Sequence, residues 1–142
     1  IPRKRLGEML NAIAEMEKKY GLRCLNVFHA GDGNLHPLVL YDSSIEEERI
    51  KAQEFGGEIL ELSVALGGTI TGEHGVGVEK INQMCVQFNE QERDLFFAIK
   101  HAFDAQALLN PGKAIPTLNR CAEFGMMHVH GGQIPFPHLP RF

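Results

Sequence analysis

The 142-residue sequence has no tryptophan, few aromatic residues and no long apolar run. A membrane-spanning helix needs about 20 predominantly apolar residues, so we do not expect an integral membrane protein. Aromatic residues make up 8% of the chain, which disfavours the stacking platforms of single-strand-binding proteins. The chain has 14 lysines and arginines against 18 acidic residues, and no basic run exceeds residues 3–5. Nucleic acid is therefore not an expected partner.

Cysteine is rare as well. The three cysteines, Cys24, Cys85 and Cys121, contain no CxxC pair, so a zinc ribbon is not predicted. An odd and widely spaced set fits a reducing, cytoplasmic compartment. The chain has no signal-peptide pattern and opens with Ile1 rather than methionine, so we expect a piece of a longer protein.

The residues that are present predict a mixed fold. Residues 3–20 carry apolar side chains at three- and four-residue steps, which is typical of an amphipathic helix, and Gly21 lies just past its end. Two short apolar segments, residues 22–29 and 35–41, are expected to be strands. Asp32 and Gly33 between them form the strongest short hairpin signal and predict a two-residue turn.

A second helix is expected over residues 45–66, where Ser44 and Glu47 have capping-box spacing. Residues 69–71 predict a short third strand, and residues 90–103 predict a last helix that Asn89 caps. This order of elements is typical of an α+β, ferredoxin-like domain, which we assign to residues 1–107. Prolines punctuate residues 108–142, which are expected to be an irregular C-terminal segment.

Two histidines flank the predicted hairpin turn. With Asp32 and Gly33 at its centre, His29 and His36 would face each other directly, with their Cβ atoms ~5 Å apart. Two converging imidazoles suit a divalent metal, although a one-residue slip would send the rings to opposite faces. The alternative is a pair of half-buried structural histidines beside a turn.

A second polar pair lies between glycines. Glu73 and His74 follow Gly72 and precede Gly75 in the sequence TGEHG. His29, His36 and Glu73 would make a three-ligand metal set that leaves positions open for water or substrate. His74 would then stand beside it as a base. The alternative for Glu73 and His74 is an ordinary solvated turn.

Three motifs, residues 28–36, 67–77 and 109–113, together resemble the C-terminal domain of FAD-linked oxidases. That family includes D-lactate dehydrogenases, D-2-hydroxyglutarate dehydrogenases and glycolate oxidases. The motifs occur in the family's order, and residues 121–130 are similar to the tail of the large, FAD-binding subunit of the bacterial glycolate oxidases. The resemblance implies a substrate (cap) domain of an enzyme that oxidises a small 2-hydroxy acid to the 2-oxo acid.

The resemblance also implies roles for individual residues. His29, His36 and Glu73 would hold a divalent metal, and zinc, manganese and iron suit these ligand types about equally. His29, His36 and Asn34 would contact the substrate. Leu38 stands where relatives that act on a longer diacid have a polar residue, so glycolate or D-lactate is the expected substrate.

For the redox step, the resemblance implies that His74 takes the hydroxyl proton while hydride passes to FAD. Asn110, Glu73 and Gly75 would lie on the flavin side of the site. No glycine-rich phosphate loop follows a strand in this sequence, so FAD would be held mainly by a missing N-terminal domain. This chain alone is therefore expected to bind FAD weakly or not at all and to show no turnover.

The resemblance further implies partner subunits of glycolate oxidase (FAD-binding and iron–sulfur), an electron acceptor, and a peripheral place at the inner face of the membrane through those subunits. Two other functions stay open at this point. One is a metal-dependent hydrolase that uses the same His29, His36 and Glu73 set without flavin. The other is a non-enzymatic ferredoxin-like module for binding or dimerisation, in which the histidines are structural.

Overall fold

The chain divides into two compact units, with the division between Val76 and Gly77. The fold was obtained as a computed structural model, and the structure describes residues 1–116. The two units are named the N-terminal and C-terminal units below. The predicted domain boundary after residue 107 stays a prediction.

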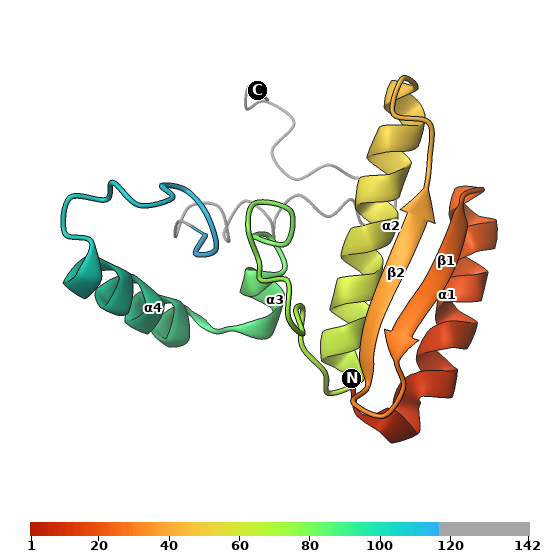
Figure 1. The fold of residues 1–142 in the computed structure, drawn as a ribbon, viewed down its shortest axis with the longest axis horizontal. Coiled ribbons are helices and arrows are strands. Elements are labelled where there is room, and N and C mark those ends of the chain that lie inside the picture. Colours follow the sequence, from red (N-terminus) through yellow and green to blue (C-terminus); the bar gives the residue numbers. More distant parts are fainter. Residues whose placement is uncertain (117–142) are drawn as a thin grey trace, which may run out of the picture. The chain divides into compact units, whose positions relative to one another are not determined.

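The N-terminal unit is a two-helix, two-strand assembly (Figure 1). A short 3-10 helix, η1 (Arg3–Arg5), leads into α1 (Leu6–Tyr20), followed by β1 (Arg23–His29), β2 (Asn34–Leu40) and α2 (Glu46–Ala65). The four main elements predicted for this region are confirmed, and with them the α+β class.

The first helix is set by its apolar spacing and by its final glycine. Met9, Ile13 and Met16 are buried and recur at steps of four and three residues. Gly21 adopts a left-handed conformation (φ 68°), and its N–H donates to the Glu17 carbonyl oxygen at 2.9 Å. Glycine is favoured here because it adopts positive φ without a side-chain clash.

The predicted capping box of the second helix is wrong. The helix begins at Glu46 after Ile45, and no side chain caps its first turn. The Ser44 hydroxyl and the Ser44 N–H both donate to Asp42 Oδ1, at 2.6 and 2.9 Å, so Ser44 is already engaged in a turn. Short polar side chains that bond the local backbone compete with helix capping in this way.

The predicted two-residue turn is also wrong. His29 pairs with Asn34 and Val27 pairs with His36, so four residues, 30–33, connect the strands. The N–H groups of Asp32 and Gly33 both donate to the His29 carbonyl oxygen, at 3.0 and 3.1 Å. Gly33 has φ +72°, and a Cβ there would lie 2.1 Å from the Ile1 carbonyl oxygen. The close approach of Ile1 therefore helps to fix the longer loop.

The predicted third strand does not form. Within residues 1–116 the sheet has two strands, β1 and β2, and residues 69–71 run as irregular backbone after α2. The ferredoxin-like arrangement is therefore not confirmed.

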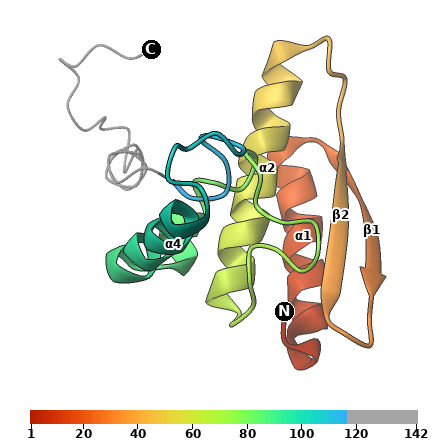
Figure 2. The same cartoon turned by 60° about the vertical axis from the view of Figure 1, so that its left-hand side comes forward.

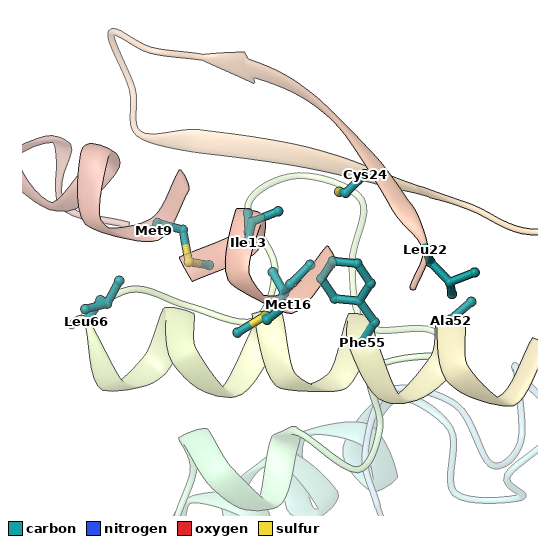
Figure 3. Close-up of a cluster of buried hydrophobic side chains, with 9 residues drawn as sticks. Met9, Ile13, Met16, Leu22, Cys24, Ala52, Phe55 and Leu66 are labelled. Atoms are coloured by element: carbon teal, nitrogen blue, oxygen red, sulfur yellow. The ribbon is translucent and has the colours of Figure 1, made fainter. Parts of the chain in front are cut away.

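A hydrophobic core joins the helices to one face of the ribbon. In Figure 2, α1 and α2 both lie on the same side of the β1–β2 ribbon. Phe55 is fully buried, and its ring stacks on Tyr20 with the centroids 5.3 Å apart. Figure 3 shows most of the buried cluster, which comprises Met9, Ile13, Met16, Leu22, Cys24, Ala52, Phe55, Ile59 and Leu66.

In the C-terminal unit, α3 (Met84–Gln87) precedes α4 (Glu90–Phe103). The predicted Asn89 cap is confirmed: its side chain accepts from the Glu92 N–H at 3.0 Å, and Glu92 Oε2 accepts from the Asn89 N–H at 2.8 Å. No helix within residues 1–116 is both long and apolar enough to cross a bilayer.

The end of α4 is fixed by Asp104. Its carboxylate accepts from Lys100 Nζ and from the N–H groups of Leu108 and Leu109, both at 2.9 Å. The Lys100 hydrogen bond and then the Leu109 and Leu108 amides hold the pKa of Asp104 below its usual value. Asp104 therefore shapes the loop that leads to Asn110.

Candidate metal and substrate site

His29 and His36 lie on the same face of the hairpin. The register places them diagonally, because His29 pairs with Asn34 and His36 lies two positions further along β2. Side chains two positions apart on a strand point to the same face, so the change of register preserves their convergence. Their ring centroids are 5.3 Å apart, with the ring planes inclined by 81°.

Glu73 reaches the same point from the loop after α2. Its Oε1 lies 2.8 Å from His36 Nε2 and 3.8 Å from His29 Nε2. These three residues are the ligand set predicted from the sequence, and the structure brings all three side chains together. His36 is the most protected, with 18% of its side chain exposed, against 62% for His29 and 50% for Glu73.

The cluster fits a divalent metal in its donor types and its spacing. One ligand atom from each of His29, His36 and Glu73 lies within 4.8 Å of the others. Metal–ligand bonds of about 2.0–2.2 Å hold two ligands of a tetrahedral ion about 3.3–3.6 Å apart, so small side-chain movements would bring these atoms to one ion. Because three protein ligands leave positions open, the cluster suits an ion that also binds a substrate.

Hydroxyl groups hold the loop that carries Glu73. Ser63 Oγ donates to the Thr69 carbonyl oxygen at 2.8 Å, and Thr69 Oγ1 donates to that of Thr71 at 2.8 Å. Thr71 Oγ1 in turn donates to the Gly75 carbonyl oxygen at 3.1 Å. Sequence reasoning missed this function of the threonines, although their alternation between glycines is visible in the sequence.

Asn34 lies next to both Glu73 and His36. Its Nδ2 donates to Glu73 Oε1 at 2.9 Å and lies 3.5 Å from His36 Nε2. A Cβ on Gly72 would lie 2.4 Å from Asn34 Oδ1, so the amide lies directly against that glycine. The family resemblance implied that Asn34 contacts substrate, and its amide here contacts a member of the candidate metal cluster.

His74 lies beside the cluster and outside the ligand set. Its ring centroid is 5.0 Å from that of His36, and the residue is exposed. Gly75, expected on the flavin side, has φ +80°. Its carbonyl oxygen accepts the hydrogen bond from the Thr71 hydroxyl. An accessible imidazole next to a candidate metal cluster is placed to exchange a proton with a ligand bound there.

Apolar side chains continue along the ribbon face that carries the two histidines. Leu38 follows His36 by two positions on the same face and pairs with Leu25. Leu25, Val27 and Leu38 are each about half exposed. A ligand at the cluster would therefore meet imidazole and carboxylate at one end and hydrocarbon beside them.

Asn110, expected near the flavin, belongs to the C-terminal unit. It adopts φ 46°, and Lys113 Nζ donates to its Oδ1 at 3.5 Å. The Ala114 N–H donates to the Gly77 carbonyl oxygen at 2.8 Å and anchors this turn. Its place beside a flavin stays a prediction, and the motif of residues 121–130 lies outside the described residues.

Residues 1–114 match the family of FAD linked oxidases, C-terminal domain. The chain belongs to this family. FAD is thus the redox cofactor that the family implies for the enzyme to which the domain contributes.

Relatives within the family of FAD linked oxidases are oxidoreductases by name. The glycolate oxidase subunit GlcD of Escherichia coli (strain K12) is 61% identical over 142 residues, covering 100% of this chain and 28% of the relative. GlcD of Bacillus subtilis (strain 168) is 40% identical over 80% of this chain and 24% of the relative. A mitochondrial D-lactate dehydrogenase [cytochrome] of Arabidopsis thaliana is 32% identical over 82% of this chain and 20% of the relative. The chain thus spans less than a third of each relative.

Proposed function

We propose that the chain supplies the metal and substrate side of a flavin-dependent enzyme that oxidises a small 2-hydroxy acid. The observation that carries the proposal is the convergence of His29, His36 and Glu73, with His74 beside them. Membership of an FAD-linked family and similarity to glycolate oxidase and D-lactate dehydrogenase subunits support the reaction class.

In this proposal His29, His36 and Glu73 would hold a divalent ion next to the carboxylate and hydroxyl groups of the acid. When bound, the ion supplies a Lewis acid for these oxygens and the flavin supplies the acceptor for the hydride. The three ligands come from a strand pair and a hydroxyl-held loop, so the chain orients the acid before any bond changes.

His74 is the proposed base. Its exposed ring lies next to the ring of His36, so it can reach a hydroxyl group oriented at the cluster. Removal of the hydroxyl proton by His74 leaves electron density on the oxygen that assists departure of the hydride from the α-carbon. General bases contribute about 10²–10⁴-fold to such steps.

Leu38 supports a small monoacid as the substrate. An apolar side chain two positions from His36, paired with Leu25, offers no partner for a second carboxylate. An unpaired carboxylate against hydrocarbon loses hydration without compensation. Glycolate or D-lactate therefore fits better than a longer diacid, and Leu38→Arg is expected to shift the kcat/KM ratio towards the diacid.

Asn110 and Gly75 are proposed to face the flavin, and the enzyme is proposed to work with other subunits and an electron acceptor. The support is similarity to proteins named as glycolate oxidase subunits. FAD would be held mainly outside this chain, because its sequence has no nucleotide-binding glycine motif after a strand.

The test of the site is titration of Zn²⁺ or Mn²⁺ into the metal-free chain by calorimetry. One ion per chain is expected, with binding lost in His36→Ala and Glu73→Gln. His101→Ala is a matched control, because it removes an imidazole of α4 that is not part of the cluster. Retention of the same ion in Glu73→Gln would contradict the site.

The test of the reaction uses the flavin-containing enzyme that carries this chain, with glycolate and D-lactate as substrates. His74→Gln is expected to lower kcat about 10²–10⁴-fold while flavin content and metal affinity stay unchanged. Metal-dependent hydrolysis by the chain without flavin would instead favour the hydrolase alternative.

A further inference from the structure

We propose that Asn34 is the positioning residue for Glu73, and that Gly72 has no side chain because the Asn34 amide occupies that space. This inference rests on the proposed metal site and assigns its organisation to two residues that do not themselves bind the ion. The expected role of Asn34 thereby changes: instead of contacting substrate, it holds Glu73, a side chain that binds the metal.

Glu73 needs support because it is a flexible side chain on an irregular loop. Half of its side chain is exposed, and the loop backbone is held by threonine hydroxyls rather than by a strand ladder. Fixing such a side chain only when an ion arrives would cost conformational entropy at that moment. A hydrogen bond that already holds the carboxylate reduces this cost.

Asn34 provides that bond from a rigid position. It is the first residue of β2, is half-buried and pairs directly with His29. Its Nδ2 donates to Glu73 Oε1 at 2.9 Å, and a hydrogen bond to an ionised acceptor is stronger than a neutral one. The same strand carries His36, so Asn34 sets the carboxylate relative to both imidazoles.

Gly72 makes this position available. A Cβ on Gly72 would lie 2.4 Å from Asn34 Oδ1, 2.9 Å from Cγ and 3.3 Å from Nδ2. The amide therefore lies against Gly72 with its oxygen nearest, and Gly72 directly precedes the acid that the amide holds. No positive φ demands glycine at this position, so the requirement is the space for Asn34.

The two residues predict a specific pattern of effects. Asn34→Ala removes the bond to Glu73. Gly72→Ala would displace the end of the Asn34 side chain, which can rotate away without moving the backbone. Both changes should therefore weaken metal binding about 10–100-fold, the usual effect of losing a partner of a metal ligand. The double variant should be no weaker than Asn34→Ala, because the displaced group is already gone.

The experiment is calorimetric titration of Zn²⁺ and Mn²⁺ into the metal-free full chain, with the melting temperature of each variant measured alongside. Asn26→Ala is the matched control: it makes the same change on β1, on the opposite face of the hairpin. The proposal expects Asn34→Ala and Gly72→Ala to lose affinity, Asn26→Ala to keep it, and the ion-free melting temperatures to stay near that of the unaltered chain.

Three results would overturn the proposal. If the chain binds one ion that His36→Ala abolishes but Asn34→Ala leaves unchanged, the metal site stands and the positioning role is wrong. If Gly72→Ala weakens binding equally with Asn34 present and absent, the space argument is wrong. If the unaltered chain binds no ion, both the proposed site and this inference are wrong.

Discussion

His29 and His36 lie diagonally across the β1–β2 ribbon, with their ring centroids 5.3 Å apart, rather than directly opposite each other. This relationship makes the two imidazoles unequal. His36 Nε2 lies 2.8 Å from Glu73 Oε1 and its side chain is 18% exposed, whereas His29 Nε2 lies 3.8 Å away and its side chain is 62% exposed.

The first prediction follows from that inequality. His36→Ala is expected to weaken divalent metal binding at least about tenfold more than His29→Ala, a difference of about 1.4 kcal/mol or more. His36 is the less exposed of the two, so solvent screens its interaction with the ion less, and its removal lowers the binding affinity more. Calorimetric titration of both variants measures the difference, and equal losses would contradict it.

The second prediction concerns the core. Phe55→Ala should lower the free energy of unfolding by about 3–5 kcal/mol, because Phe55 is fully buried and stacked on Tyr20. Urea denaturation followed by circular dichroism measures this loss. Phe103→Ala is the control, since that ring is 86% exposed and its truncation should change stability by about 0.5 kcal/mol or less.

The third prediction concerns acid sensitivity at Asp104. The Lys100 hydrogen bond and the Leu109 and Leu108 amides lower the folded-state pKa of Asp104, so its stabilisation is present above the unfolded pKa of about 3.9. This stabilisation is lost as the pH falls through the lower, folded-state value. Asp104→Asn should therefore lower the melting temperature at about pH 7 and lower it much less near pH 2.

Asp94→Asn makes the same change at an exposed position of α4 and serves as the control. Its melting temperature should follow that of the unaltered chain at both pH values. If Asp104→Asn lowered the melting temperature by the same amount at every acid pH, the carboxylate charge would not be what stabilises the loop.

The fourth prediction concerns the cap of α4. Asn89→Ala removes the acceptor for the Glu92 N–H and should destabilise the chain by about 0.5–2 kcal/mol. Asn89→Ser keeps an acceptor and should restore most of the loss. Both are measured by denaturation, and an unchanged Asn89→Ala variant would show that the capping box contributes little.

Local signals in the sequence predicted the helices and strands because their causes are local. The apolar spacing of α1, its final Gly21 and the Asn89 cap all act within one or two turns. Ser44 failed as a cap for an equally local reason, since Asp42 accepts both of its hydrogen bonds. Two competing local partners cannot be ranked from spacing alone.

Contacts between distant residues explain the other errors. The hairpin loop became longer where Ile1 packs against Gly33, and residues 69–71 stayed irregular because side-chain hydroxyls satisfy carbonyl groups that a strand would have paired. The convergence of His29 and His36 was still predicted correctly. The observed strand pairing differs from the predicted one by two positions, and an even shift leaves both side chains on the same face of the ribbon. Asn34 and Gly72 could not be linked by sequence, since 38 positions separate them.

The hydroxyl-held loop has a consequence for handling the protein. Asn34 and Glu73 are 39 positions apart, and all of α2 lies between them. An ion shared by the ribbon and this loop would act as a removable cross-link around that helix. Since an ion at a hundred times its dissociation constant adds about 2.7 kcal/mol to stability, a chelator in the buffer would lower the apparent melting temperature. Preparations that differ in trace ion content would then differ in heat resistance without any difference in covalent structure.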